Sequence, residues 1–437
     1  MPETVGPRAT GGFGAADIAA AVAARDLDPV EVVEAHLAAI EAAPQLNAVI
    51  TTCADAALDR ARGHLDGPLA GVPLLVKDIL DTAGVRTTYG SALFSDHVPV
   101  STAAGVERAE EAGAIVIGKA NLHEFAWGTT SQNPHYGAVQ NPARPGRIAG
   151  GSSGGNAAAL AAGLCALGLG TDTGGSARGP SACCNTVGYK PPLGMVPTAG
   201  CFPLAPSFDT VAPMARSVAD TVLLYTAVAR RAPVRTEARG LTIGVLTRPP
   251  RLSPAVPAVE QTAALRGRLL TAAERFEALG ATVVEVVLPE PEGDLVPAVL
   301  AEAAISHREH YPAQRDRYGA DTQAKLDLAG SVTAAAAEEA RAAIRAWRER
   351  ARTEPAVDLV LGPVLGGEVP SIDAHEQDVR DVLLAYTRPF NFLDWPAIAI
   401  GDLQLAGRDE TRLLGAALAW EQAYGPPATE DEPSPDA

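Results

Sequence analysis

The sequence predicts an α/β protein in which a large mixed β-sheet is covered by helices on both faces. Short apolar segments with strand character recur along the chain, and alanine-rich helical patterns lie between them. This alternation is typical of α/β proteins, whose mainly parallel or mixed sheets are buried on both sides. The expected strands are 71–80, 114–119, 165–172, 241–246, 281–288 and 358–363.

The expected helices have recognisable boundaries. Residues 14–44 contain two amphipathic patterns, and between them Asp28 can cap a helix that begins with Pro29 in its first turn. Two further patterns, "STAAGVERAEEAG" at 101–113 and "GNAAALAAGL" at 155–164, lie between expected strands. We expect a single domain over residues 1–425, with an internal seam at 230–240 and a disordered acidic tail at 426–437.

Composition limits the partners and the compartment. The formal net charge of -17 argues against nucleic acid or an anionic membrane surface as the main partner, because both attract basic patches. The five cysteines form no CxxC pair, and the first residues resemble no secretory leader, so we expect a cytoplasmic protein. No apolar run approaches the ~20 residues of a membrane-spanning helix.

Several common catalytic motifs fail on inspection. The segment "GAIVIGKA" at 113–120 departs from the phosphate-binding loop at Ala120 and reads as the interior of a strand. The histidines are scattered without metal-ligand spacing, and the G-x-S-x-G elbow of Ser-His-Asp hydrolases is missing. The sequence therefore predicts no metal and no cofactor.

Two local features could carry chemistry. Lys77 lies in an apolar strand, where a salt bridge with Asp78 or Asp81 is the simpler interpretation. In "GTDTGGSARGP" at 170–180, two glycines precede Ser176, so backbone N–H groups could converge on one point as an oxyanion hole requires. The same four residues, "TGGS", also occur as an ordinary turn.

The segment 150–191, "GGSSGGNAAALAAGLCALGLGTDTGGSARGPSACCNTVGYKP", resembles the signature segment of the amidase signature family. Ser152 and Ser176 are 24 residues apart and Lys77 lies 75 residues before Ser152, and both separations suit the Ser-Ser-Lys triad of that family. The similarity extends over most of the chain. It implies the amidase signature fold, with a signature core at about 60–230.

The resemblance also implies roles for individual residues. By this resemblance, Ser176 takes the position of the family's nucleophile and Lys77 that of its base. Ser152 takes the position of the bridging serine, which in the family follows a cis peptide bond. A second group is expected to support these three: backbone N–H groups of Thr173, Gly174, Gly175 and Ser176 as the oxyanion hole, Ser153 and Asp172 in the supporting network, Arg178 as an anchor of the turn, and Trp127 in the substrate pocket or in the core.

The function that this resemblance implies is cleavage of a small carboxylic amide through an acyl-enzyme on Ser176. The expected partner is then a small-molecule amide, with a possible homodimer and with neither nucleic acid nor membrane. The alternative is the amidase (glutaminase) subunit of a tRNA-dependent amidotransferase. A catalytically silent binding homologue is a third hypothesis, which the presence of all three triad residues disfavours.

Overall fold

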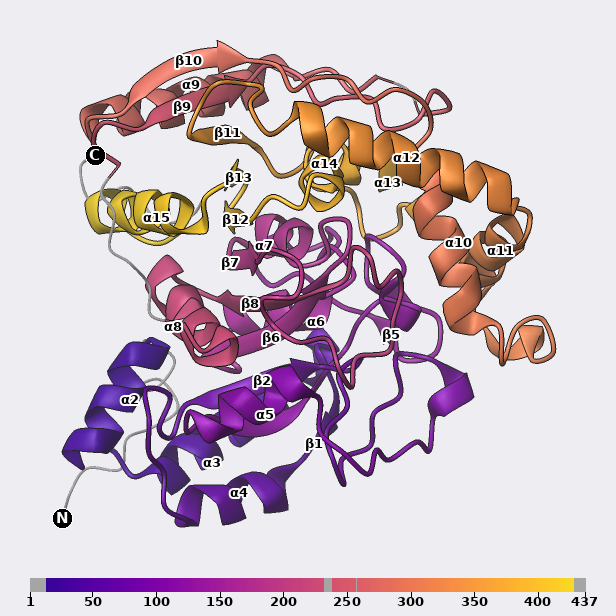
Figure 1. The fold of residues 1–437 in the computed structure, drawn as a ribbon. Helices are drawn as coiled ribbons and strands as arrows, with labels where there is room; N and C mark the ends of the chain where they lie inside the picture. The colour runs from indigo at the N-terminus through magenta and orange to yellow at the C-terminus, as the bar shows by residue number, and fades with distance from the viewer. Residues whose placement is uncertain (1–12, 232–237, 257, 428–437) are drawn as a thin grey trace.

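An eleven-stranded sheet runs through the protein from the lower end to the upper end of Figure 1. The computed structural model describes residues 13–231, 238–256 and 258–427. A separate two-stranded sheet is formed by β4 (Gln132–Asn133) and β5 (Gly137–Ala138). The large sheet contains β1 (Val49–Thr52), β2 (Pro73–Lys77), β3 (Ile115–Ala120), β6 (Leu167–Asp172), β7 (Val187–Lys190), β8 (Thr210–Ala215), β9 (Thr242–Leu246), β10 (Thr282–Val286), β11 (Leu359–Pro363), β12 (Ala397–Ile400) and β13 (Leu403–Gly407).

The large sheet is mixed, as the sequence predicts. Its strand order is β1-β3-β2-β6-β8-β7-β12-β13-β11-β9-β10. The pairs β2 with β3, β2 with β6, β9 with β10 and β9 with β11 are parallel, and the remaining pairs are antiparallel. All six expected strands form. The strands of this sheet that the sequence did not indicate, such as β7 and β12, are four to six residues long and lack a bounded run of large apolar residues.

Helices cover both faces of this sheet (Figure 1). Successive side chains of a strand point to opposite faces, so Leu74 and Val76 of β2 pack in one hydrophobic cluster and Leu75 in another. The helices are α2 (Ala15–Ala24), α3 (Pro29–Ala42), α4 (Ala54–Arg62), α5 (Ala104–Glu111), α6 (Gly154–Ala161), α7 (Arg178–Cys184), α8 (Val218–Ala229), α9 (Ala263–Ala278), α10 (Val296–His307), α11 (Ala320–Gly330), α12 (Ala334–Arg350), α13 (Glu376–Leu384), α14 (Arg388–Phe392) and α15 (Glu410–Tyr424).

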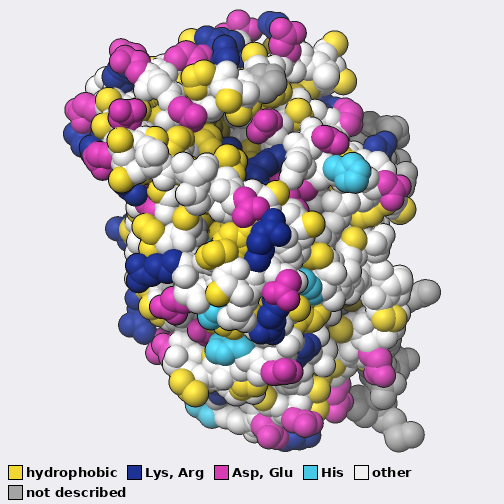
Figure 2. All heavy atoms as spheres, turned by 90° about the vertical axis from the view of Figure 1, so that its right-hand side faces the viewer, with side chains coloured by type: hydrophobic (Ala, Val, Ile, Leu, Met, Phe, Trp, Pro, Cys, Tyr) yellow, Lys and Arg dark blue, Asp and Glu magenta, His cyan; other side chains and the backbone are white. Residues whose placement is uncertain are grey.

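The helices α10, α11 and α12 form a group at the right of Figure 1. Figure 2 shows this side of the molecule, where basic and acidic side chains are interspersed with hydrophobic ones. None of the helices in the described ranges is long and apolar enough to cross a membrane. The single domain over residues 1–425 stays a prediction; residues 428–437 of the expected tail and 232–237 of the expected seam lie outside the described residues.

The parallel pair of β2 and β6 fixes where chemistry can occur. Leu74, Leu75 and Val76 pair with Leu167, Gly168 and Leu169, so both strands end at the same edge of the sheet. Lys77 is the last residue of β2, and Asp172 is the last residue of β6. Ligands in α/β sheets bind beyond the carboxyl ends of parallel strands, which places the candidate site at this edge.

The stretch "GGSSGG" leads directly into α6, which packs closely against the sheet. Both Gly154 and Gly155 begin the helix and are buried. A methyl group added at Gly155 would lie 2.6 Å from the carbonyl oxygen of Ala48. The Gly155 N–H also donates to the Asn121 carbonyl at 3.0 Å. The glycine therefore permits the close approach of backbone to backbone that seats this helix.

We predict that Gly155→Ala lowers the free energy of unfolding by about 1–3 kcal/mol, because the backbone next to β1 and β3 cannot yield to the added methyl group. Urea denaturation measures this change. The matched control is Gly267→Ala in α9, where an added methyl group meets no atom within 4 Å. This control should stabilise the protein by about 0.5–1 kcal/mol, because alanine is the better helix former. Equal effects at both positions would contradict the packing argument.

Candidate active site

The Lys77 side chain is fully buried and has two hydroxyl partners. Its Nζ donates to Ser152 Oγ at 2.8 Å and to Thr171 Oγ1 at 2.7 Å. Burial lowers the Lys77 pKa from 10.5 to about 7, because the charged form loses its hydration. Neither Asp78 nor Asp81 forms an ion pair with Lys77; the hydroxyl and N–H of Thr88 bind Asp78 instead. A substantial fraction of the amine is therefore neutral near pH 7.

Ser152 is held from behind by the loop at 123–131. The peptide bond Gly151–Ser152 is cis, as the resemblance implied. The Ser152 carbonyl accepts the N–H of His123 at 3.2 Å and the hydroxyl of Ser131 at 3.3 Å. A methyl group on Gly151 would lie 2.7 Å from the carbonyl carbon of Thr129. These contacts direct the Ser152 hydroxyl toward Lys77.

Ser176 lies in the turn that follows β6 and is 9% exposed. Its carbonyl accepts the Ser153 N–H at 3.1 Å, which joins the two serine-bearing segments. The Ser176 hydroxyl has no hydrogen-bond partner among the residues that the structure describes, and it borders a cavity. Of the two hydrogen bonds that the expected relay requires, the one between Lys77 and Ser152 is therefore present. The one between Ser152 and Ser176 Oγ is not formed in the described residues.

The turn between β6 and α7 corrects one detail of the expected oxyanion hole. The Gly175 N–H donates to Asp172 Oδ1 at 2.9 Å, so it is not free for a substrate. Gly175 has a φ of +132°, which favours glycine, and an added methyl group would lie 2.7 Å from Thr387 Cβ. The N–H groups of Thr173, Gly174 and Ser176 have no partner in the described chain. These three stay the predicted donors.

A buried ion pair fastens this turn. Arg178 Nε and Nη2 donate to the two Asp172 carboxylate oxygens at 3.0 and 2.9 Å. The remaining guanidinium donors reach the Thr387 carbonyl at 3.0 Å, Gln404 Oε1 at 3.2 Å and Asn391 Oδ1 at 2.7 Å. Burial by itself would raise the Asp172 pKa, but the charge and hydrogen bonds of Arg178 hold it well below its usual range. Arg178 is therefore an anchor with no donor left for a substrate.

The cavity beside Ser176 is small. Its volume is about 50 Å³, which leaves room for only a few water molecules at about 10–15 Å³ each. Trp127, expected in the pocket or in the core, forms part of its wall and is 2% exposed, so it fits both descriptions. The rest of the wall is mostly apolar or backbone, with two arginines: Ala126, Gly128, Thr129, Thr173, Gly174, Leu204, Val299, Arg380, Leu384, Arg388 and Phe392.

A second buried charge network lies behind the 123–131 loop. Lys325 Nζ donates to the Trp127 carbonyl at 2.7 Å and pairs with Asp321 at 2.5 Å and Glu376 at 3.1 Å. Asp321 also lies 3.0 Å from His123 Nε2. Helices α11 and α13, which lie far along the chain, thereby hold the loop that supports Ser152 and forms the wall at Trp127.

Sequence reasoning missed residues that act on the predicted ones. Thr171 binds the amine of Lys77, and Asp209 accepts the Thr173 hydroxyl at 2.6 Å. Thr171 directly precedes Asp172 in an expected strand, so its position beside the signature was a usable signal. Asn391, Gln404 and Thr387 lie more than 200 residues from the signature turn, and no local pattern identifies them.

Comparison with known proteins decides the family. A family model described as Amidase matches residues 31–413. The chain belongs to the amidase family. This amidase is a hydrolase that acts on amide C–N bonds, and the amidase signature fold predicted from the signature segment is confirmed.

Individual relatives can be aligned with nearly the whole length of this amidase. It is 34% identical to a subunit of the glutamyl-tRNA(Gln) amidotransferase of Anaeromyxobacter dehalogenans (strain 2CP-C), over 96% of this chain and 98% of that one. The same subunit from Synechococcus sp. (strain CC9605) is also 34% identical, over 90% and 92%. A crystal structure of an amidase superposes with a TM-score of 0.83 at 29% identity, over 94% of this chain and 99% of that one.

These relatives correct the expected partners. The expected partners, a small-molecule amide with neither nucleic acid nor membrane, are wrong in leaving nucleic acid out, because curated relatives of this chain are subunits of an enzyme named for a tRNA. The exclusion of nucleic acid rested on the net charge of -17. Net charge is a sum over the whole chain, and it says nothing about a nucleic acid that another member of a complex holds.

We predict that kcat/KM of this amidase rises with pH through a midpoint near 7. Lys77 must be unprotonated to accept a proton, and its pKa of about 7 sets the pH at which the amine becomes neutral. Initial rates of ammonia release between pH 5.5 and 9 measure the profile. Lys77→Met should lower kcat by about 10²–10⁴-fold. A wild-type profile that is flat over this range would contradict the role of Lys77.

We predict that Arg178→Met destabilises the protein by about 3–5 kcal/mol, because it leaves the Asp172 carboxylate buried without its partner. Urea unfolding followed by tryptophan fluorescence measures the change. The control is Arg266→Met, which breaks the exposed 3.1 Å pair with Glu285 and should cost about 1 kcal/mol or less. A cost of this smaller size at Arg178 would show that the turn does not depend on the buried pair.

Proposed function

We propose that the protein is the amidase subunit of a tRNA-dependent amidotransferase, in which it releases ammonia from glutamine. The observation that carries this proposal is the 34% identity to a glutamyl-tRNA(Gln) amidotransferase subunit over 96% of this chain and 98% of the relative. Both chains are covered almost completely, so the likeness is not confined to the signature segment. The location implied by this role is the cytoplasm, as the sequence also predicted.

The proposed chemistry begins at Ser176. Its oxygen attacks the carbonyl carbon of the amide while its proton passes to Ser152, whose own proton passes to the neutral Lys77 amine. The N–H groups of Thr173, Gly174 and Ser176 stabilise the negative charge that develops on the carbonyl oxygen. One such donor is typically worth about 10²–10³-fold in rate.

The second half of the reaction reverses the proton path. The relay returns the proton to the amide nitrogen, the C–N bond breaks, and ammonia leaves an ester on Ser176. Water then attacks this ester and gives up a proton along the same path, which restores the free Ser176 and releases the acid. The Lys77–Ser152 distance of 2.8 Å supports direct transfer, because it lies within hydrogen-bond reach.

A second candidate function is cleavage of a small amide other than glutamine. One observation favours it: the chain superposes on a solved amidase with a TM-score of 0.83.

The test compares ammonia release by the purified protein alone and together with the subunits that copurify with it. We predict that glutaminase activity rises at least tenfold, an effect of about 1.4 kcal/mol, when those subunits and glutamyl-tRNA are added. Ser176→Ala should remove the activity in both preparations. Rapid cleavage of other amides by the protein alone, with no response to tRNA, would favour the second candidate.

A further inference from the structure

Two arginines line the cavity that contains Ser176. Arg380 comes from α13 and Arg388 is the first residue of α14. They are the only charged side chains in the wall of this cavity within the described parts of the chain. Both are partly exposed, and they lie on either side of Leu384, four residues from each along the chain.

Among the described residues, neither guanidinium forms a direct bond to the protein, although Glu376 is close enough to Arg380, and Asp381 to Arg388, for their charges to interact. Across residues 13–231, 238–256 and 258–427, no hydrogen bond or ion pair within 4 Å involves Arg380 or Arg388. The buried Arg178 differs sharply, because each of its guanidinium nitrogens is engaged. Burial lowers the Arg388 pKa to about 10, so the group remains charged at neutral pH. Charged groups in such a setting gain from a partner of opposite charge.

Arg388 lies next to the oxyanion turn. The hydroxyl of the preceding residue, Thr387, donates to the Gly174 carbonyl at 2.8 Å. A methyl group added at Gly174 would lie 3.6 Å from Arg388 Nε. The guanidinium is therefore adjacent to the backbone that leads to Ser176. A substrate that contacts both the Arg388 guanidinium and the Ser176 hydroxyl therefore needs to be only a few atoms long.

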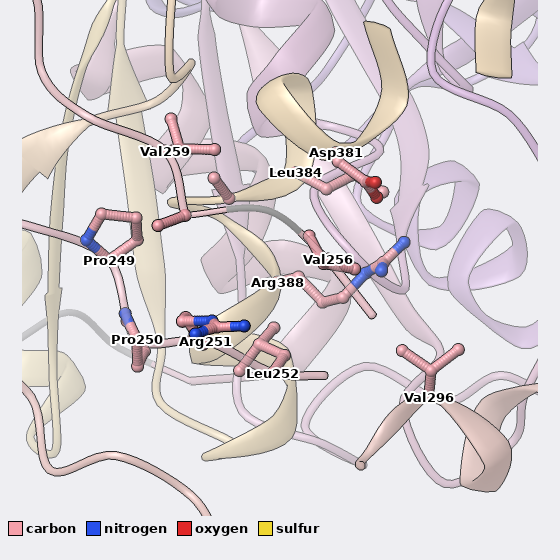
Figure 3. A pocket seen from close by; sticks show the side chains of 12 residues that line it. Pro249, Pro250, Arg251, Leu252, Val256, Val259, Val296, Asp381, Leu384 and Arg388 are labelled. Carbon is pink, nitrogen blue, oxygen red and sulfur yellow. The ribbon is translucent and has the colours of Figure 1, made fainter. Parts of the chain in front are cut away.

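Nearby charges do not neutralise this pair by direct contact. Lys325 pairs with Asp321 and Glu376, which removes it as a substrate ligand; Glu376 also interacts with the charge of Arg380, but no direct ion pair joins the two. Asp381 borders a neighbouring cavity of about 40 Å³, which shares Leu384 and Arg388 with the first. In Figure 3, Asp381 and Arg388 lie on one side of this second cavity.

The second cavity has a mostly apolar lining that also contains Arg251 and Asp381. Leu252, Val256, Val259 and Val296 contribute to its lining around Arg388 (Figure 3). Apolar neighbours lower the local dielectric beside the partly exposed Arg388, and an ion pair between a guanidinium and a substrate anion gains strength there. The setting favours a substrate group that can meet the guanidinium with two oxygens.

We propose that Arg380 and Arg388 form a carboxylate subsite, which selects amides whose acyl part also carries a carboxylate. A planar guanidinium matches the two oxygens of a carboxylate, whereas a neutral methyl group in the same place leaves both charges unpaired. The substrate class is the short monoamides of dicarboxylic acids, and glutamine belongs to it through its own carboxylate. This inference rests on the proposed amide hydrolysis at Ser176.

The test measures a ratio of kcat/KM for two amides of equal length, glutaramate and pentanamide. We predict that the wild type prefers glutaramate at least tenfold, and that Arg388→Gln or Arg380→Gln reduces this ratio by about 10–100-fold, mainly through KM. Arg266→Gln, on the surface of α9, should keep the wild-type ratio. A wild-type ratio near one, or a ratio unchanged in both pocket variants, would overturn the proposal.

Binding to Ser176→Ala separates the subsite from catalysis. Calorimetric titration should show at least tenfold tighter binding of glutaramate than of pentanamide, and this difference should fall when Arg388→Gln is added. If the wild type cleaves no amide but this binding pattern holds, the proposed function fails and the subsite stands. If amides are cleaved and the two ligands bind equally, the subsite fails alone.

Discussion

The site depends on an amine that is buried without a counter-ion in contact. Lys77 has no exposed surface, and its nearest polar partners are the hydroxyls of Ser152 and Thr171 at 2.8 and 2.7 Å. Hydroxyls satisfy the hydrogen bonds of the amine without supplying a negative charge. Burial therefore shifts the Lys77 pKa to about 7, and a residue that is ordinarily a cation becomes available as a base.

Much of the surrounding structure keeps these hydroxyls in place. Ser152 is fixed between the 123–131 loop and α6, while Asp172 and Arg178 hold the turn that carries Ser176. The two networks draw on different parts of the chain, since Lys325 in α11 secures the loop and Asn391 in α14 secures the turn. In both networks the supporting charges are paired, Arg178 with Asp172 and Lys325 with Asp321 and Glu376.

The two arginines of the cavity, Arg380 and Arg388, differ from these supporting charges. Arg178 and Lys325 have their donors occupied by protein atoms, whereas Arg380 and Arg388 line the cavity with donors unused. The family assignment gives the reaction at an amide C–N bond, and it leaves the remainder of the substrate open. The two arginines of the cavity bear on the acyl part of the substrate, because they favour an anionic acyl group over a neutral one.

The sequence by itself determined the fold class, six strands of the central sheet, and the triad candidates Lys77, Ser152 and Ser176. These features are local: apolar runs bounded by turns predict strands, and the signature segment carries its serines at fixed spacing. Only the tertiary structure decided that Gly175 N–H binds Asp172, that Thr171 shares the Lys77 amine, and that Arg388 lies beside Gly174. The second of these contacts joins residues 94 positions apart and the third joins segments more than 200 residues apart, so both depend on tertiary packing. The Gly175–Asp172 bond lies within one turn, and its direction follows from the backbone geometry of that turn. The net charge of -17 misled about partners for a related reason: it averages over the surface and records no position.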